Sequence, residues 1–284
     1  SHFRGIEIWD TATDSDKYAD AGWIGRLYDD AGAPPADFAA DGVVLGQGVF
    51  GPLAAPGRRI LVLENIDDSL GTAAKMPAIP QMSGMSAMGA DLNPLSLVLG
   101  VQRDFQNGAA AILAQNIESV DPKATFPDGD FAAQLEMAAK LFAGGVRAPI
   151  IKVSLNGFDT HAGQQQDQTA LHAELAGGLS AFSKSMKAHG IWDQVLVMTY
   201  AEFGRRPKEN GSGGTDHGTS APHFLMGGRV KGGLYGEQPP LDDLVNRDNL
   251  QHRLHFRSLY ATVASEWWGL DASFLKEPPL GAIA

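Results

Sequence analysis

The stretch of residues 149–200 constrains the fold most, because it joins two buried-looking strands through one long amphipathic helix. Residues 149–155 form an almost unbroken apolar run, which is typical of a strand covered on both faces. The helix is predicted to follow and to reach about His189, where Gly190 is placed to end it. Its apolar residues recur three or four apart, as one buried stripe requires: Leu171, Leu175, Leu179, Phe182 and Met186. Residues 194–200 then predict a second strand.

A strand, a crossover helix and a strand form a right-handed parallel unit. The loops that follow the two strands should therefore leave the same edge of the sheet. The first of these loops contains Asp159 and His161, and the second contains Glu202 and Arg205. Open α/β sheets bind ligands at this edge, so we expect these side chains to lie close together.

A later glycine-dense loop, residues 210–218, carries Asp216 and His217 and is expected at the same edge. Asp159, His161 and His217 together offer two imidazoles and a carboxylate, a common ligand set for zinc or a similar divalent ion. Asp216 either joins them as a ligand or orients His217 from outside. The sequence has no cysteine, so any metal must be bound by His and carboxylate ligands.

Glu202 and Arg205 leave two interpretations open. Glu202 fits a further metal ligand or a general base, and Arg205 fits bidentate binding of an anionic group. In the alternative, Glu202 pairs with Arg205 or Arg206, and the pair only holds the loop. The remaining internal histidines are predicted to be surface or packing residues because of their places on helices and strands: His172, His189, His223, His252 and His255.

Charge and length narrow the classes of function. The chain has 33 acidic and 22 basic residues and a net charge of -11, which argues against nucleic acid as a partner. No apolar run approaches the length of about 18 residues that a membrane span needs. A chain of 284 residues is long enough to bury about 75% of its extended surface. We therefore expect one domain over residues 1–284.

The flanking segments predict further elements. Short apolar runs bounded by Gly and Pro predict two strands, and apolar periodicity predicts helices on either side of the central unit. A stretch rich in Met, Gly, Ser and Pro is expected to be an ordered surface loop, with a flap or a partner-binding patch as the alternatives. The expected strands are 43–50 and 60–63; the helices are 23–28, 97–117, 131–142 and 253–268; the loop is 75–94.

Several spaced motifs resemble the domain-of-unknown-function family 1501, within the alkaline phosphatase and sulfatase superfamily. The opening SHFRGIEIWDTA (1–12) also resembles a segment that normally lies well inside the family's proteins. The resemblance implies a three-layer α/β/α sandwich with a mostly parallel sheet, here lacking the N-terminal strand region with its metal-binding Asp. The motifs are FDTHAGQ (158–164), AEFGRR (201–206), GTDHG (214–218), GGRVKGG (227–233) and FRSLYATVASEWWG (256–269).

The resemblance further implies a metal-dependent hydrolase of phosphate or sulfate esters. Asp159 and His161 match the superfamily's Asp and His on one metal, and His217 matches the later His of that site. Glu202 and Phe203 stand where phosphatases and sulfatases usually have Asp-His, so one divalent ion, zinc first, is expected rather than two. The expected substrate is a small anionic ester.

Ser1 falls near the expected place of the nucleophile, where a metal-lowered hydroxyl pKa would let it attack phosphorus or sulfur. The plain alternative is a frayed terminal residue without a catalytic role. Family members often begin with a twin-arginine export signal, which implies a periplasmic or cell-envelope location.

Two functions from other classes stay open. The replacement of Asp-His by Glu202 and Phe203 favours a degenerate relative that binds ligands at the cell envelope without catalysis. The Met-rich stretch 75–94 favours a structural or assembly role, with that stretch as the contact surface.

Overall fold

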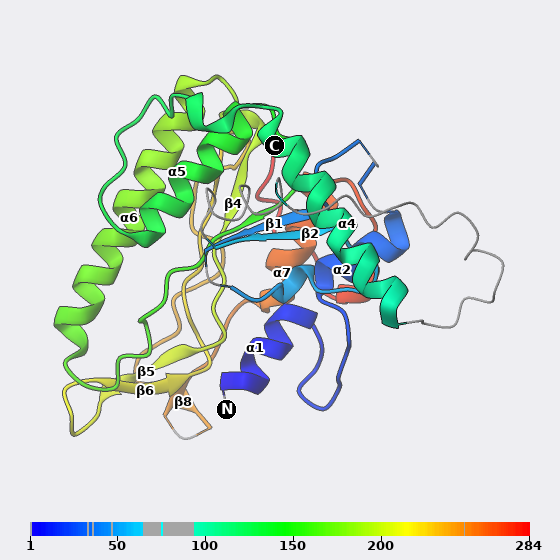
Figure 1. Cartoon of the computed structure of the whole chain (residues 1–284). Helices are drawn as coiled ribbons and strands as arrows, with labels where there is room; N and C mark the ends of the chain where they lie inside the picture. Colours follow the sequence, from blue (N-terminus) through cyan, green and yellow to red (C-terminus); the bar gives the residue numbers. More distant parts are fainter. Residues whose placement is uncertain are drawn as a thin grey trace.

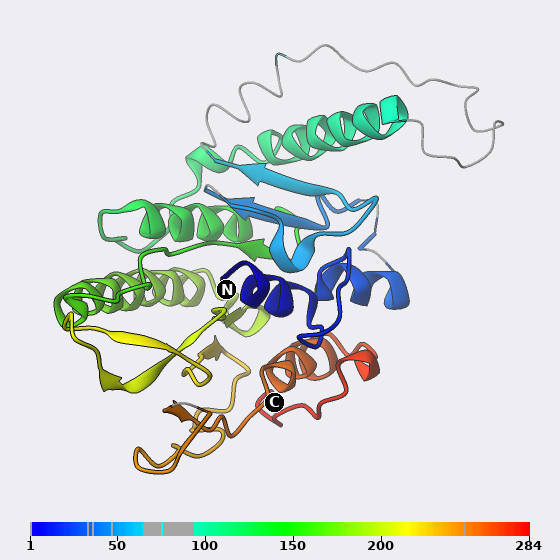
Figure 2. The same cartoon turned by 90° about the horizontal axis from the view of Figure 1, so that it is seen from below.

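The computed structural model describes residues 2–32, 34–35, 37–46, 48–64, 75, 94–246 and 248–284, without the side chains of 94–99. It is a mixed α/β structure in which helices pack on both faces of a small three-stranded parallel sheet (Figures 1 and 2). Most of the predicted loop 75–94 lies outside the described residues.

The parallel sheet has the strand order β2-β1-β3. Its strands are β1 (Gly42–Leu45), β2 (Ile60–Leu63) and β3 (Ile151–Lys152), and Val43 of β1 pairs with both neighbours. All four residues of β1 are buried, as a central strand covered on both faces requires. The three predicted strands are therefore present, although β1 ends before the predicted limit of 50 and β3 is shorter than the apolar run that predicts it.

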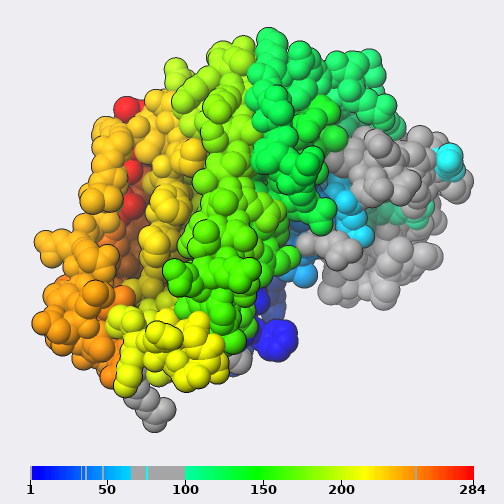
Figure 3. Space-filling view, turned by 90° about the vertical axis from the view of Figure 1, so that its left-hand side faces the viewer, coloured from blue at the N-terminus to red at the C-terminus, as the bar shows by residue number. Residues whose placement is uncertain are grey.

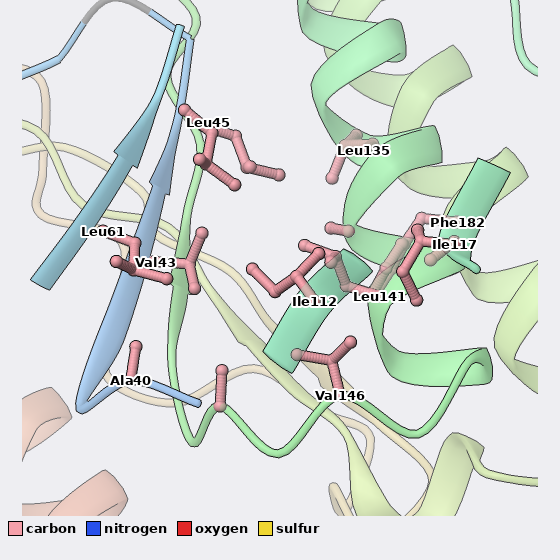
Figure 4. Packing of buried hydrophobic residues seen from close by; sticks show 14 of the residues in the cluster. Ala40, Val43, Leu45, Leu61, Ile112, Ile117, Leu135, Leu141, Val146 and Phe182 are labelled. Atoms are coloured by element: carbon pink, nitrogen blue, oxygen red, sulfur yellow. The ribbon is translucent and has the colours of Figure 1, made fainter. Parts of the chain in front are cut away.

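One face of the sheet is covered by the helices α4 (Pro94–Leu113), α5 (Asp130–Ala143) and α6 (Gln164–Ala188). Alternate residues of β1 and β2 point to this face, where they meet the apolar stripes of the helices (Figure 4). Each fully buried side chain of this size stabilises the fold by about 1.5–3 kcal/mol. The labelled contacts include Val43, Leu45 and Leu61 from the strands and Ile112, Leu135, Leu141 and Phe182 from the helices.

The opposite face is covered by α2 (Trp23–Ala31) and α7 (Phe256–Ala261). Val44 of β1 points to this side and belongs to a second buried cluster. At its centre the rings of Trp23 and Tyr260 stack with centroids 4.4 Å apart. The predicted C-terminal helix is thus present and packs against the sheet.

Helix α6 confirms the predicted long helix after β3 and its end at Gly190. Gly190 adopts a φ of +71°, a conformation that glycine takes without the Cβ penalty of other residues. The amide of Gly190 donates to the carbonyl of Lys187, and the amide of Ile191 donates to the carbonyl of Met186, both at 3.0 Å. These two bonds are the Schellman pattern that satisfies the last helical carbonyls.

The predicted parallel pairing after α6 is wrong in the described residues. Strand β4 (Leu196–Met198) pairs antiparallel with β7 (Leu225–Gly227), and it is not hydrogen-bonded to β3. An apolar run identifies a buried strand, but it does not identify the neighbour that satisfies its backbone groups. The two polar loops are therefore brought together by a different route.

That route is an antiparallel hairpin of β5 (Gly204–Glu209) and β6 (Thr215–Gly218). Much of the two stretches predicted as loops, 201–206 and 210–218, thus forms strands. The sequence of the hairpin is polar because much of it faces solvent, so it lacks the apolar alternation by which strands are predicted. In the space-filling view the hairpin, in yellow, lies beside the light-green start of α6 (Figure 3).

Helix α1 (His2–Thr11) packs beside α7. Its Trp9 stacks on Phe256, and the Trp9 carbonyl accepts a hydrogen bond of 2.9 Å from the Tyr260 hydroxyl. These contacts fix the direction in which the first turn of α1 points. The smaller elements are β8 (Leu244–Val245), β9 (Asn249–Leu250), a π-helix (Thr262–Trp267) and the 3-10 helices Gly51–Leu53, Ile117–Ser119, Trp192–Gln194 and Ser273–Leu275.

Among the described residues, no helix combines the length and apolarity needed to cross a lipid bilayer.

Candidate metal centre

Asp159 lies at the centre of a cluster of three histidines that come from three separate segments. Its Oδ1 atom is 2.7 Å from Nε2 of His217 and 2.9 Å from Nε2 of His161. Its Oδ2 atom is 3.3 Å from Nε2 of His2. The Nε2 atoms of His161 and His217 are 3.0 Å apart. The structure therefore brings together the three residues predicted as ligands and adds His2 to them.

The cluster has the size and chemistry of a divalent metal site. Ligand atoms of His2, Asp159 and His217 all lie within 4.8 Å of one another. Around a tetrahedral zinc ion with bonds of about 2.05 Å, neighbouring ligand atoms are about 3.3 Å apart. The contact of Asp159 with His2 already has about that spacing, and its contacts with His161 and His217 would need to widen by about 0.4 and 0.6 Å. Imidazole nitrogen and carboxylate oxygen are ligands that zinc accepts.

The hairpin supplies His217 and turns it toward the loop that follows β3. His217 is paired in register with Arg205 across β5 and β6, and the glycine-dense turn between the strands contacts the start of α6. The amide of Gln164 donates to the carbonyl of Gly213 at 3.0 Å, and the Asn210 side chain donates to the carbonyl of His161 at 3.0 Å. The turn residues thus fix the loop that carries Asp159 and His161.

Arg205 ties this loop to the hairpin. Its guanidinium donates to the carbonyls of Phe158, at 2.7 Å, and Thr215, and it lies 3.7 Å from Oδ1 of Asp159. Most of its side chain is buried, and desolvation lowers the pKa of the guanidinium. Arg205 therefore holds the backbone beside Asp159. The N–H groups that it uses for this are the same kind of donor that bidentate binding of an anion would need.

The second interpretation of this loop, in which Glu202 pairs with Arg205 or Arg206, does not match the structure. The Oε1 atom of Glu202 instead lies 2.9 Å from Nδ1 of His2. The next residue, Phe203, stacks on the His217 ring with centroids 4.1 Å apart and an interplanar angle of 17°. Glu202 thus contacts His2, and Phe203 contacts both His217 and His2.

Residues 11–280 of the chain match the family described as "Protein of unknown function (DUF1501)". The chain belongs to the DUF1501 family. This match confirms the family resemblance that the spaced motifs carry, and it includes Asp159, His161 and His217. No curated protein and no solved structure matches the chain at a significant level.

Asp216 of this DUF1501 chain lies beside His161. Successive residues of a strand point to opposite faces, so Asp216 and its neighbour His217 diverge. The Oδ1 atom of Asp216 is 3.7 Å from Nδ1 of His161, and its Oδ2 atom is 3.9 Å from Arg206. Asp216 is therefore closer to a role in orienting His161 than to one in orienting His217.

The electrostatics of the site favour an ionised Asp159. The hydrogen bond with His217 is the largest of the effects that lower the pKa of this carboxyl, and the charges of the nearby histidines act in the same direction.

A different carboxyl of the DUF1501 chain, Asp10 on α1, has a raised pKa instead. Burial raises the pKa of Asp10 to about 6, and the charge of Glu202 adds to this effect, while Lys152 and Tyr200 oppose it.

Motifs and ligand spacing in the sequence do not predict His2. The residue lies outside the span that matches DUF1501, and no neighbouring ligand type at metal-site spacing marks it. Its only signal is its place in the opening segment that resembles the family. Ser1, the predicted nucleophile, lies outside the described residues.

The other histidines lie in packing or surface positions. His223 contacts the Trp9 ring, and burial lowers its pKa to about 4. His189 lies within hydrogen-bonding distance of the Asp121 carbonyl, and His255 caps α7 by accepting from the amide of Arg257.

Proposed function

We propose that this protein is a metal-dependent hydrolase of phosphate or sulfate esters, with one divalent ion, zinc first, bound by Asp159, His161, His217 and His2. The observation that carries the proposal is the convergence of three imidazole nitrogens on one carboxylate at contacts of 2.7–3.3 Å. The resemblance of the chain's motifs to the alkaline phosphatase and sulfatase superfamily supports it, because that resemblance implies this class of enzyme.

The site is open enough for a small substrate. Asp159 has 51% of its side chain exposed, His161 has 45% and His217 has 31%, so solvent and a small ester reach the ligand atoms. When bound, a divalent ion at these ligands would polarise the ester and lower the pKa of a hydroxyl or water. The protein's own part is to hold three imidazoles so that they point at one place. The chain's net charge of -11 favours small anionic esters over polyanions.

Of the predicted catalytic residues, Arg205 and Ser1 have a proposed part in the reaction. Arg205 holds the backbone next to Asp159 and contributes positive charge at the edge of the site. Ser1 directly precedes His2 in the chain, and we propose it as the nucleophile. Asp216 supports His161. We also propose the alkaline-phosphatase-like three-layer sandwich as the fold, supported by helices on both faces of the parallel sheet, and a periplasmic or cell-envelope location.

The test is metal analysis followed by turnover. Protein purified without chelator is expected to hold close to one zinc or similar ion per chain, and to hydrolyse an aryl phosphate or an aryl sulfate. Asp159→Asn should lose both the ion and the turnover, whereas Asp128→Asn, which changes an exposed carboxyl just before α5, should keep both. Wild-type protein with no bound metal and no turnover of either ester class would remove the proposal.

A binding protein of the same fold is the second candidate. It is favoured by Glu202 and Phe203, because both side chains contact histidines and neither offers the second metal site of the superfamily. This candidate predicts that the protein binds inorganic phosphate or sulfate without turnover, and that the affinity survives His217→Ala. A loss of anion binding together with zinc in that variant would favour the hydrolase.

A further inference from the structure

We infer that Glu202 is a positioning residue, which fixes the tautomer and orientation of His2 so that the Nε2 lone pair faces Asp159. The inference rests on the proposed metal centre and assigns to Glu202 neither metal binding nor proton transfer with substrate. It also assigns a metal-ligand role to His2.

The imidazole of His2 lies between two carboxylates. Its Nδ1 atom is 2.9 Å from Oε1 of Glu202, and its Nε2 atom is 3.3 Å from Oδ2 of Asp159. In a neutral imidazole one nitrogen donates and the other accepts. A carboxylate can only accept, so the shorter contact with Glu202 favours the proton on Nδ1. The free lone pair is then on Nε2, the nitrogen that faces Asp159 and the other ligands.

Helix α1 is shaped to let Glu202 approach His2. Gly5 lies three residues after His2, and a Cβ atom at Gly5 would come within 3.1 Å of the Glu202 backbone oxygen and 3.4 Å of its Cβ. A side chain at this position would require α1 or residue 202 to shift by a few tenths of an ångström. Glu202 is also less exposed than Asp159, at 24% against 51% of the side chain, which strengthens its hydrogen bond.

The same short segment supports other ligands. The ring of Phe203 stacks on His217 and meets the edge of His2 at 5.2 Å between centroids. The guanidinium of Arg205 lies 4.9 Å from the Phe203 ring and donates to the carbonyl next to Asp159. Residues 202–205 thus contact His2, His217 and the Asp159 loop from outside the ligand cluster. Such outer contacts set the orientation and basicity of metal-binding histidines.

The geometry separates this role from the two other roles predicted for Glu202. The two nitrogens of an imidazole point away from each other, so the carboxylate at Nδ1 lies on the far side of His2 from the cluster. To bind the same ion, or to accept a proton from a substrate there, Glu202 would have to release His2. Its contact with His2 therefore excludes both roles in this conformation.

The first experiment reads the tautomer of His2 in zinc-free protein, so it requires neither metal nor activity. Long-range 1H–15N correlation spectra at about pH 8 distinguish the two neutral tautomers, and His2→Ala assigns the signals of His2. Wild type and Glu202→Gln are expected to show His2 with its proton on Nδ1, because the amide oxygen still accepts. Glu202→Ala should shift His2 toward the other tautomer. A proton on Nε2 in wild type, or no change in Glu202→Ala, would overturn the inference.

The second experiment measures zinc affinity by competition with a chelator, and circular dichroism confirms that each variant is folded. Glu202→Ala should lower the affinity by about 10- to 100-fold, the range for outer-shell partners of ligating histidines, while Glu202→Gln should lose less. Glu209→Gln is the matched control, because it changes an exposed Glu at the other end of β5. Equal and large losses in Glu202→Gln and Asp159→Asn would mark Glu202 as a direct ligand. A wild-type chain that binds no zinc would instead remove the proposed function, with the tautomer still deciding the role of Glu202.

Discussion

Asp159 and His217 are 58 residues apart in the sequence, yet Oδ1 of Asp159 lies 2.7 Å from Nε2 of His217. The contact joins the loop after β3 to the second strand of the β5–β6 hairpin. His161 and His2 approach the same carboxylate from two further directions. A single carboxylate surrounded by three imidazoles is the relationship on which the proposed metal centre depends.

Loss of either partner of this contact should abolish tight metal binding. We expect His217→Ala and Asp159→Ala to lower the affinity for zinc by more than about 100-fold, because each removes a direct ligand from a small set. His252→Ala removes an exposed histidine that contacts His255 instead, and it should leave the affinity unchanged. Isothermal titration with zinc chloride checks this, and equal affinities in all three variants would count against the assignment.

Arg205 should matter for stability as well as for the site. Its guanidinium donates to two backbone carbonyls beside the cluster, and an unsatisfied buried carbonyl costs about 1–3 kcal/mol. We therefore expect Arg205→Ala to lower the free energy of unfolding by roughly 2–4 kcal/mol. Lys208→Ala, at an exposed position of the same strand, should change it by less than about 0.5 kcal/mol. Urea denaturation measures both, and an unchanged midpoint in Arg205→Ala would contradict this role.

Asp10 predicts a particular pH dependence of stability. Burial raises its pKa from 3.8 to about 6, so between these values the folded state binds more protons than the unfolded state. The contribution of Asp10 is therefore fully present below about pH 3.8 and is lost as the pH rises through about 6. Asp10→Asn mimics the protonated acid and should not show this loss. Its free energy of unfolding should rise relative to wild type by roughly 1–2 kcal/mol from pH 4 to pH 7.

Asp128→Asn is the control for that titration, because Asp128 is exposed. The difference between this variant and wild type should stay flat across the same pH range. A flat difference for Asp10→Asn as well would show that the Asp10 carboxyl has its ordinary pKa.

Gly204 and Gly190 are required for different reasons: the first leaves no space for a Cβ atom, and the second has a backbone conformation that favours glycine. A Cβ atom at Gly204 would lie 1.8 Å from the backbone oxygen of Ser220, whereas one at Gly190 would meet no atom within 4 Å but requires a φ of +71°. Gly204→Ala should therefore cost more than about 3 kcal/mol or prevent folding, and Gly190→Ala about 1–2 kcal/mol. Thermal unfolding of both variants measures the difference, and similar small losses would show that the β5–β6 region shifts without cost.

The sequence predicts the elements of this fold better than it predicts their pairing. The apolar runs at β1, β2 and β3 and the periodic stripes of α5 and α6 follow directly from which side chains must be buried. The partner of β4 is not predictable in this way, because any apolar strand satisfies the same pattern. The hairpin of β5 and β6 is hidden for the opposite reason, since its exposed strands carry charged residues that are typical of loops.

The candidate site was predictable in part. Asp159, His161 and His217 lie within recognisable polar motifs. The structure brings them together through the β5–β6 hairpin rather than through the expected parallel unit. His2 and the contact with Glu202 were not predictable, because the distance along the chain is 200 residues and neither residue has a ligand-type neighbour at metal-site spacing. Only the packing of α1 against the rest of the chain reveals this contact.

The most direct test of the central claim is a crystal structure of the zinc-soaked protein with anomalous data collected at the zinc absorption edge. One anomalous peak is expected within about 2.0–2.2 Å of an Asp159 oxygen and of Nε2 of His161, His217 and His2. A map with no peak at this cluster, or with its zinc peak bound by other residues, would contradict the claim.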